Sequence, residues 1–218
     1  MERLTVAIDG PAGAGKSSAA RLVAKRLGYL YIDRAFTWAM LQEKIDIGDA
    51  EAVRALTERI DIRLEPLEDK CRVFVGEREV TDAIRTQDIS SRVSSVSALA
   101  VVREKLVQLQ RNMAEGGGVI LDGRDIGTVV LPKADLKIFL TASVESRARR
   151  RYLEVQAKGG TETLEDIAAS IASRDDMDSH RAVSPLRQAD DAILLDNSEL
   201  NLEETADAIT DLIQQRCR

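Results

Sequence analysis

Several residue types on which protein chemistry often depends are scarce in this sequence. Aromatic residues occupy only 3% of the 218 positions, so we expect a hydrophobic core built mainly from Leu, Ile, Val and Ala. The only histidine is His180, which we take as exposed and non-catalytic, so histidine-dependent triads and metal sites are not expected. The two cysteines, Cys71 and Cys217, lie far apart without metal-ligand spacing. They indicate unlinked thiols in a reducing compartment.

Long apolar segments and a surplus of positive charge are also missing. No stretch approaches the roughly 18–20 apolar residues that a membrane span needs, and the first residues enter a strand-like run without the pattern of a signal peptide. The net charge of −6 argues against a general nucleic-acid binder, which usually carries a basic surplus. We therefore expect a cytoplasmic protein, monomeric by default, that binds neither membranes nor nucleic acid.

Strand-like and helix-like segments alternate along most of the chain. Apolar β-branched runs bounded by turn residues predict strands at 4–9, 30–33, 119–122, 136–141 and 192–196. Periodic apolar spacing predicts helices at 16–27, 35–44, 97–114, 143–157, 162–174 and 201–215. This alternation is typical of α/β proteins, and we predict a parallel five-stranded sheet flanked by helices. Acidic residues stand at the carboxyl ends of four of the runs, which indicates a ligand site at that edge of the sheet.

The segment from 60 to 96 has a different pattern. Apolar and polar residues alternate at 60–65, 71–76 and 78–82, which predicts a small antiparallel sheet. We therefore divide the chain into a core segment at 1–59, an insertion at 60–95 and a second core segment at 96–218.

The stretch IDGPAGAGKSS at 8–18 fits the phosphate-binding pattern G-x-x-x-x-G-K-[ST]. Such a loop turns its backbone N–H groups inward, which requires positive φ angles and small side chains, and the helix N-terminus behind it favours anions. An apolar strand before the stretch and a helix after it supply this setting, so we predict a nucleoside triphosphate site. Lys16 is expected to reach the β- and γ-phosphates, and the Ser17 hydroxyl to ligate Mg²⁺. The predicted ATP-binding residues are Gly10, Pro11, Ala12, Gly13, Ala14, Gly15, Lys16, Ser17 and Ser18.

Arginines outside the loop are candidates for cancelling the charge of bound phosphates. Arg124 follows a predicted strand in a Gly-Arg-Asp turn, where a guanidinium fork matches phosphate oxygens. In RARRR at 147–151, the residues Arg147, Arg150 and Arg151 share one helical face. For any single one of these three, a solvated basic helix face is the alternative.

A third charged segment, RDDMDSHR at 174–181, spaces Arg174, Asp178 and Arg181 by four and three residues. If the segment is helical, the three side chains share one face and can surround a ribose phosphate. A surface ion pair worth about 0.3–0.5 kcal/mol is the alternative for the segment alone. Its occurrence together with a phosphate-binding loop favours the functional interpretation.

Long strings in the second half of the chain resemble the bacterial cytidylate kinase family. They are GRDIGTVVLPKADLKIFLTAS (123–143), ESRARRR (145–151) and RDDMDSHRAVSPL (174–186), and the similarity includes DAIRT (82–86) and VREKL (102–106). The resemblance covers nearly the whole chain. It implies a nucleoside monophosphate kinase fold with a nucleotide-binding insertion and a short lid at about 145–160. It also implies ATP and CMP or dCMP as substrates, with Mg²⁺.

The resemblance also implies roles for individual residues. Ser94, Arg103 and Asp125 correspond to residues that read cytosine, and Arg124 and Arg181 to arginines that bind phosphate. Arg174 and Asp178 correspond to residues near the phosphate and ribose of the monophosphate. With Arg34, which is discussed below, these are the predicted substrate-binding residues. The predicted catalytic residues are Lys16, Asp33, Arg124, Arg147 and Arg151.

Two aspartates at strand ends, Asp33 and Asp122, are both candidates for holding the water shell of Mg²⁺ or for orienting the acceptor phosphate. The sequence does not divide these two tasks between them.

The stretch 34–39 departs from the family pattern D-[TS]-G-A-x-Y-R, because it reads Arg-Ala-Phe-Thr-Trp-Ala after Asp33. In one interpretation, Arg34 compensates for the arginine that is replaced by Ala39, and activity toward CMP survives with altered affinity. Alternatively, Arg34 and Phe36 reshape or block the acceptor pocket, or the change has little effect. A kinase with another acceptor and a nucleotide-binding protein with weak turnover are the alternative functions. Phe36 and Trp38 are candidates for stacking on a base, although such residues more often belong to the core.

Overall fold

The computed structural model describes residues 4–27, 33–66, 71–86, 88–89, 92, 95–96, 99–157, 159–181 and 184–217. The chain divides into two compact units. One unit combines 1–27 with 118–218, and we call it the loop unit because it contains the glycine-rich loop. The other comprises 28–117, and we call it the insertion unit.

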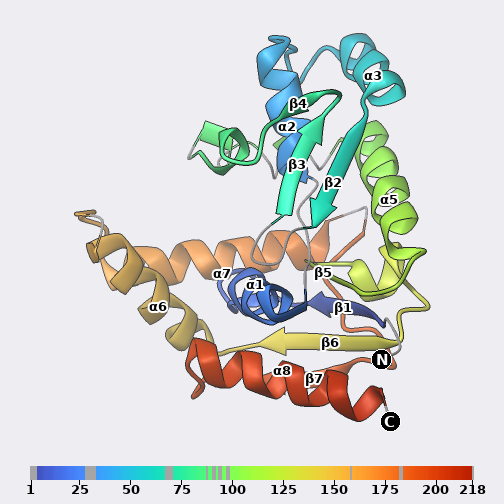
Figure 1. Ribbon diagram of the computed structural model, residues 1–218. Coiled ribbons are helices and arrows are strands. Elements are labelled where there is room, and N and C mark those ends of the chain that lie inside the picture. Colours follow the sequence, from blue (N-terminus) through green and yellow to red (C-terminus); the bar gives the residue numbers. More distant parts are fainter. Residues whose placement is uncertain are drawn as a thin grey trace. The chain divides into compact units, whose positions relative to one another are not determined.

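A parallel sheet forms the centre of the loop unit. Its strands are β1 (Thr5–Asp9), β5 (Val119–Gly123), β6 (Leu136–Thr141) and β7 (Ile193–Asp196). The order across the sheet is β5-β1-β6-β7, and every pairing is parallel. Val6, Ala7 and Ile8 are buried, as expected for a strand in the interior of a sheet covered on both faces. Figure 1 shows β1 and β6 pointing the same way, so their carboxyl ends share one edge.

The predicted α/β class and parallel sheet are confirmed, but the predicted number of five strands is wrong for the part of the chain that the structure describes, where the sheet has four. The difference concerns the run at 30–33. Residues 30–32 lie outside the described residues, and Asp33 is the first residue of a helix.

In the described residues of the loop unit, four α-helices and a short π-helix accompany the sheet. They are α1 (Lys16–Leu27), the π-helix η2 (Ile126–Val130), α6 (Val144–Ala157), α7 (Leu164–His180) and α8 (Leu202–Arg216). Helix α1 packs beside α8, and α6 packs beside α7 around Ala148, Ile167 and Ile171. A capping box of Asn201 and Glu204 begins α8. Among the helices of the described residues, none is long and apolar enough to cross a membrane.

The insertion unit contains a small antiparallel sheet, as predicted. Its order is β2-β3-β4. The elements formed by its described residues are α2 (Asp33–Gln42), α3 (Ala50–Arg59), β2 (Ile62–Pro66), β3 (Cys71–Val75), β4 (Arg78–Glu79), the 3₁₀-helix η1 (Ala83–Arg85) and α5 (Ala100–Ala114). Helix α3 was not predicted from the sequence. Its buried residues Val53 and Leu56 join Phe36 and Trp38 in one hydrophobic core. Phe36 and Trp38 are therefore core residues of this unit.

Candidate functional site

The glycine-rich loop connects β1 to α1 at the carboxyl edge of the parallel sheet. Gly10, Gly13 and Gly15 all have positive φ angles, of 147°, 77° and 86°. At Gly10 a Cβ atom would lie 1.9 Å from the carbonyl oxygen of Leu140, so only glycine fits between the loop and β6. The loop therefore has the backbone that the motif predicts, and the helix behind it directs a positive dipole end toward the loop.

Three side chains bond to carbonyl oxygens of the loop. Lys16 Nζ donates to Pro11 O at 2.7 Å, and Arg147 Nη1 donates to Ala12 O at 2.8 Å. Asn197 Nδ2 donates to Ala14 O at 3.0 Å. The loop is thus held by donors from its own helix, from α6 and from the residue that follows β7.

Lys16 is only 4% exposed, although it carries an ammonium group. Burial and, to a smaller extent, the nearby charge of Arg124 lower the pKa of Lys16 to about 7, against the carboxylates of Asp122, Asp9 and Asp178, which raise it. A bound polyphosphate would add negative charge beside the ammonium and favour its protonated form. The site is therefore electrostatically suited to an anion.

Asp9 ends β1 and anchors the segment that follows β5. Its two carboxylate oxygens each accept a backbone N–H at 2.7 Å, from Ile126 and from Gly127. Burial raises the pKa of Asp9, although these two hydrogen bonds oppose the rise. A Cβ at Gly127 would lie 3.3 Å from Asp9 Oδ2, which explains a glycine there. Asp9 thereby fixes the segment that carries Arg124 and Asp125.

Ser17 donates its hydroxyl to Asp122 Oδ2 at 2.6 Å. These hard oxygen atoms are of the type that Mg²⁺ prefers, and Mg²⁺ usually keeps several waters instead of a full set of protein ligands. Within the described part of the chain, no group of three or more His, Cys, Asp or Glu side chains could hold a metal ion. The two oxygen atoms, Ser17 Oγ and Asp122 Oδ2, are of the kind that would fit a partly hydrated Mg²⁺. Of the two aspartates that the sequence left open, Asp122 is the one beside Ser17, and the side chain of Asp33 is not described.

The structure brings several predicted phosphate-binding residues together through ion pairs. Arg124 Nε contacts Asp178 Oδ2 of α7 at 2.7 Å, and both side chains are about one-fifth exposed. Arg181 Nη2 lies 3.7 Å from Asp125 Oδ1. The charges of Arg124 and Asp178 also act on the pKa of Lys16, Arg124 lowering it and Asp178 raising it. Arg174 belongs to the same helix as Asp178 and is exposed.

The arginines of α6 separate into different surroundings. Arg147 is only 4% exposed and donates to the carbonyls of Ala12 and Ala142. Arg150 donates to carbonyl oxygens of Asn197 and Leu200. The described contact of the predicted catalytic residue Arg151 is an exposed ion pair with Glu154 of its own helix, so the structure does not bring Arg151 to the loop.

Two residues beside the loop were not recognised in the sequence. Asp175 pairs with Arg147 at 2.7 Å and accepts the backbone N–H of Ala12 at 3.3 Å. Asn197 is 2% exposed and donates to Ala14. Asp175 stands next to Arg174 in the charged segment RDDMDSHR at 174–181, so its position gave a signal. Nothing in the sequence around Asn197 indicates a contact with a loop 183 positions away.

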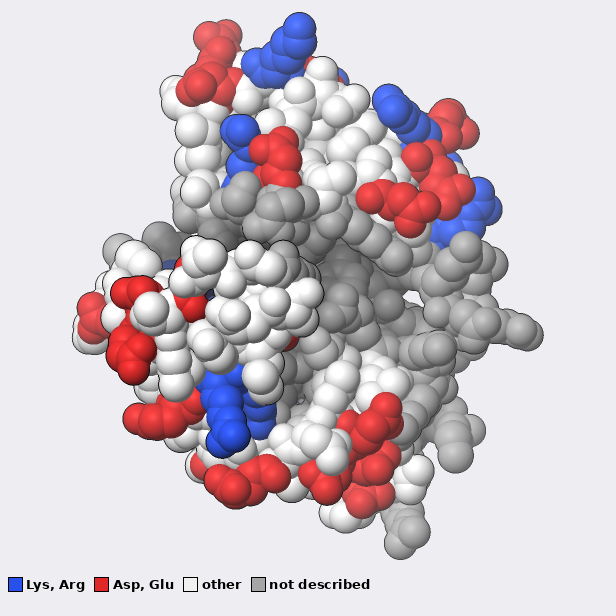
Figure 2. All heavy atoms as spheres, turned by 90° about the vertical axis from the view of Figure 1, so that its left-hand side faces the viewer, with Lys and Arg blue, Asp and Glu red and all other residues white. Residues whose placement is uncertain are grey.

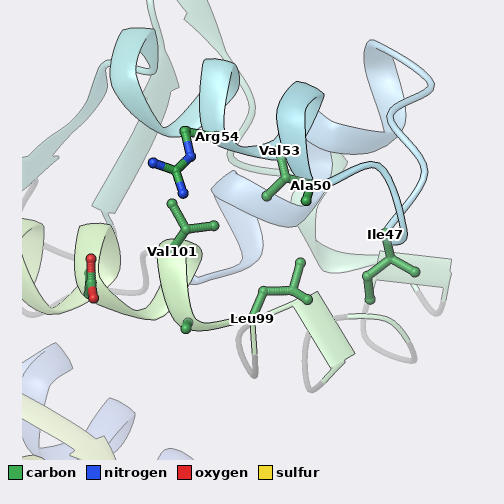
Figure 3. A pocket seen from close by; sticks show the side chains of 8 residues that line it. Ile47, Ala50, Val53, Arg54, Leu99 and Val101 are labelled. Atoms are coloured by element: carbon green, nitrogen blue, oxygen red, sulfur yellow. The ribbon is translucent and has the colours of Figure 1, made fainter.

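The remaining predicted substrate-binding residues belong to the insertion unit. Ser94 lies outside the described residues, and only the backbone of Arg34, in α2, is described. Arg103 is a half-buried residue of α5. A surface cavity of about 390 Å³ lies between α3 and α5, where Val53 faces Leu99 and Val101 (Figure 3). None of the predicted substrate-binding residues lines this cavity, so it gives no support to their assignment.

Charges on the surface are mixed in sign. On the face drawn in Figure 2, Lys and Arg side chains are scattered among Asp and Glu side chains and uncharged surface. The cations closest to the loop, Lys16 and Arg147, are instead buried. Positive charge is therefore concentrated at the loop by a few buried groups, in a chain whose net charge is negative.

A phosphate-binding loop at the carboxyl edge of a parallel sheet, with a buried lysine behind it, defines a P-loop nucleotide-binding protein. The family model described as cytidylate kinase matches residues 6–215. A cytidylate kinase of Exiguobacterium sibiricum is 51% identical, with 98% of each chain covered. That of Bacillus subtilis is 48% identical over 100% of this chain and 99% of its own, and that of Ligilactobacillus salivarius is 48% identical over 99% of each. The chain belongs to the cytidylate kinase family.

Proposed function

We propose that this chain is a kinase that transfers the γ-phosphate of ATP to CMP or dCMP, giving ADP and CDP or dCDP. The observation that carries the proposal is the intact loop with the buried Lys16 behind it, in a chain that matches cytidylate kinases over residues 6–215. The relatives named above all bear the name cytidylate kinase. No finding favours another acceptor or a binding protein with weak turnover.

The loop holds the donor nucleotide. Residues Gly10–Ser18 surround the β- and γ-phosphates of ATP with backbone N–H groups, and Lys16 adds its ammonium charge. Phosphoryl transfer requires little covalent chemistry from a protein, because positioning and charge stabilisation supply most of the catalysis. Arg147 contributes by holding the Ala12 carbonyl, which keeps the loop in this shape.

Ser17, through its hydroxyl, and Asp122, directly or through water, would hold Mg²⁺ beside the donor phosphates. Bound there, the ion would supply positive charge that neutralises the phosphate oxygens. The hydroxyl of Ser17 is hydrogen-bonded to Asp122, so the two oxygen donors already lie side by side.

The arginines around the loop bind the phosphate groups. Arg124 and Arg181 exchange part of their pairing with Asp178 and Asp125 for phosphate oxygens when substrate binds. Their side chains are neither fully buried nor fully exposed, so they are accessible to a ligand while their carboxylate partners keep them oriented. Arg174 joins them from α7.

The acceptor nucleotide is bound by residues from more than one segment. Arg34, Ser94, Arg103 and Asp125 contact CMP in this proposal, on the strength of the family resemblance. The monomeric state, the cytoplasmic location, the lid at about 145–160 and the three segment boundaries stay predictions.

Steady-state kinetics with CMP, dCMP, UMP and AMP test the proposed activity. We expect ADP release with CMP and dCMP, with kcat/KM at least about tenfold above that for UMP and AMP, because base-reading hydrogen bonds discriminate strongly between nucleotides. Equal rates with AMP and CMP would indicate another acceptor. ATP binding without ADP release from any acceptor would indicate a binding protein.

A further inference from the structure

The side chain of Asn197 is almost fully buried, yet the reaction described above does not use it. It is 2% exposed, and it follows directly after β7. Its backbone N–H donates to Thr141 O at 2.8 Å, at the end of β6, so the main chain is fixed to the sheet. The buried amide itself reaches the loop, where Nδ2 donates to Ala14 O at 3.0 Å.

We propose that Asn197 is a positioning residue of the phosphate-binding loop, whose amide holds the Ala14 carbonyl so that the Gly15 N–H faces the bound phosphate. This inference rests on the proposed function, because it assigns the loop to a nucleotide.

The geometry of the peptide group gives the reason. The carbonyl of Ala14 and the N–H of Gly15 belong to one planar peptide, and in a trans peptide they point in opposite directions. The described residues contain no cis peptide bond. A donor that fixes the Ala14 carbonyl on the outer side of the loop therefore fixes the Gly15 N–H on the inner side. Pre-oriented donors bind an anion without paying for reorganisation at the moment of binding.

The amide of Asn197 is itself held in one orientation. Thr205 Oγ1 donates its proton to Asn201 O at 2.7 Å, so toward Asn197 it can only accept, and it lies 3.3 Å from Nδ2. On the other side, Arg150 Nη1 donates to Asn197 Oδ1 at 3.3 Å. Because Thr205 Oγ1 is an acceptor and Arg150 Nη1 is a donor, the amide is oriented with Nδ2 toward Thr205 and the loop and with Oδ1 toward Arg150.

Close packing of the amide against the loop supports the same assignment. Gly15 has a φ of 86°, and a Cβ placed there would lie 3.8 Å from Asn197 Nδ2. The amide thus lies against the residue whose N–H it is proposed to orient. The other side-chain donors to loop carbonyls, Lys16 and Arg147, are charged, whereas Asn197 fixes the loop without adding charge beside the phosphates.

Two substitutions separate the donor function from packing. Asn197→Ala removes the whole amide. Asn197→Asp keeps the size and the oxygen that faces Arg150, but replaces the donor with an acceptor that faces the Ala14 carbonyl. Because the change to Asp also adds a negative charge beside the loop, the loss that it shares with the uncharged variant Asn197→Ala is the part assigned to the missing donor.

A matched control comes from Asn201, the cap of α8 in the same connection. Its side chain bonds to the Glu204 N–H and has no bond to the loop among the described contacts. Loss of an N-cap lowers helix stability, so Asn201→Ala reports the effect of a destabilised β7–α8 connection alone.

The test measures ADP binding by calorimetry and the KM values for ATP and CMP, with the melting temperature of each variant. For Asn197→Ala we expect the Kd for ADP and the KM for ATP to increase about five- to tenfold. An increase of this size corresponds to the loss of one buried hydrogen bond. Asn197→Asp should be affected at least as strongly, while KM for CMP changes less than about twofold because the acceptor does not touch this peptide. Asn201→Ala should lower the melting temperature and leave the KM for ATP unchanged.

Other outcomes overturn the inference. If both Asn197 variants bind ADP within about twofold of the unchanged chain, or if Asn201→Ala weakens ADP binding as much as they do, Asn197 has no positioning role. If the unchanged chain binds ADP and phosphorylates CMP while the variants behave like it, only this inference fails. If the unchanged chain does not bind ADP, the proposed function fails as well.

Discussion

At the scale of single residues, the buried Lys16 determines much of the behaviour of the loop. Burial and the neighbouring Arg124 lower the pKa of its ammonium group to about 7, although three carboxylates lie close enough to oppose the change. Without a bound anion, the ammonium group of Lys16 therefore loses its proton at a lower pH than that of an exposed lysine. Binding energy from the phosphates then stabilises a charge that folding alone disfavours.

The lowered pKa of Lys16 predicts that the free energy of unfolding depends on pH. The pKa of Lys16 is about 7 in the native chain and about 10.4 when unfolded, so between these values the unfolded chain binds more protons and stability rises with pH. We expect the free energy of unfolding to rise by roughly 2 kcal/mol, relative to the variant Lys16→Met, between about pH 7 and pH 9. Urea titrations of both proteins across this range measure the difference. A difference that stays constant with pH would mean that Lys16 titrates as in the unfolded chain.

The sequence predicted the residues of the loop but only some of the residues that hold it. Lys16 and Ser17 belong to an eight-residue motif, so their roles follow from local spacing. Asp175 and Asn197 contact the loop from 163 and 183 positions away, and such contacts depend on how the strands are ordered in the sheet. Arg151 illustrates the opposite case, because helical spacing grouped it with Arg147 and Arg150, whereas its described contact is an exposed ion pair with Glu154.

At the scale of elements, α6 and α7 act on the loop as a pair. Arg147 of α6 and Asp175 of α7 bond to each other, and each bonds to one backbone group of Ala12. Neither helix alone supplies both a donor and an acceptor to the backbone of Ala12. The packing of α6 on α7 therefore determines the position of the first half of the loop.

This arrangement predicts the effect of Asp175→Asn. The substitution leaves the buried guanidinium of Arg147 without its carboxylate, and we expect the free energy of unfolding to fall by roughly 2 kcal/mol, because carbonyl oxygens still accept from Arg147. Nucleotide binding should weaken as well, since the Ala12 N–H loses a charged acceptor.

The neighbouring residue Asp176 provides the control. Its side chain is 75% exposed and contacts only His180 among the described residues, so Asp176→Asn should change stability and ADP affinity little. Chemical denaturation and calorimetry of the two variants measure both effects. Equal losses in the two variants would show that general charge, and not the pair with Arg147, stabilises the loop.

Predictability from sequence differed between elements for physical reasons. Helix α1 was predicted with its observed limits, because the loop fixes its beginning and the apolar spacing is regular. Helix α3 was not predicted, because its sequence AEAVRALTER contains only two large apolar residues, Val53 and Leu56. Two such residues are too few to show the regular apolar spacing of a helix. Helix α7 extends beyond its predicted end at 174 to His180, since its last two turns are polar.

At the scale of the whole molecule, the described chain consists of a loop unit and an insertion unit, each with its own sheet and its own core. The proposed ATP-binding residues all belong to the loop unit. The residues proposed to read cytosine come from both, because Asp125 belongs to the loop unit and Arg103 to the insertion unit.

Phosphate transfer itself tests the central claim most directly. ATP labelled at the γ-phosphate is incubated with the full chain, Mg²⁺ and either CMP or AMP, and the labelled product is identified by chromatography. We expect the label in CDP, in amounts at least about tenfold above those in ADP formed from AMP, and a loss of nearly all transfer in Lys16→Met. Label released only as inorganic phosphate, or transfer that persists in Lys16→Met, would contradict the account.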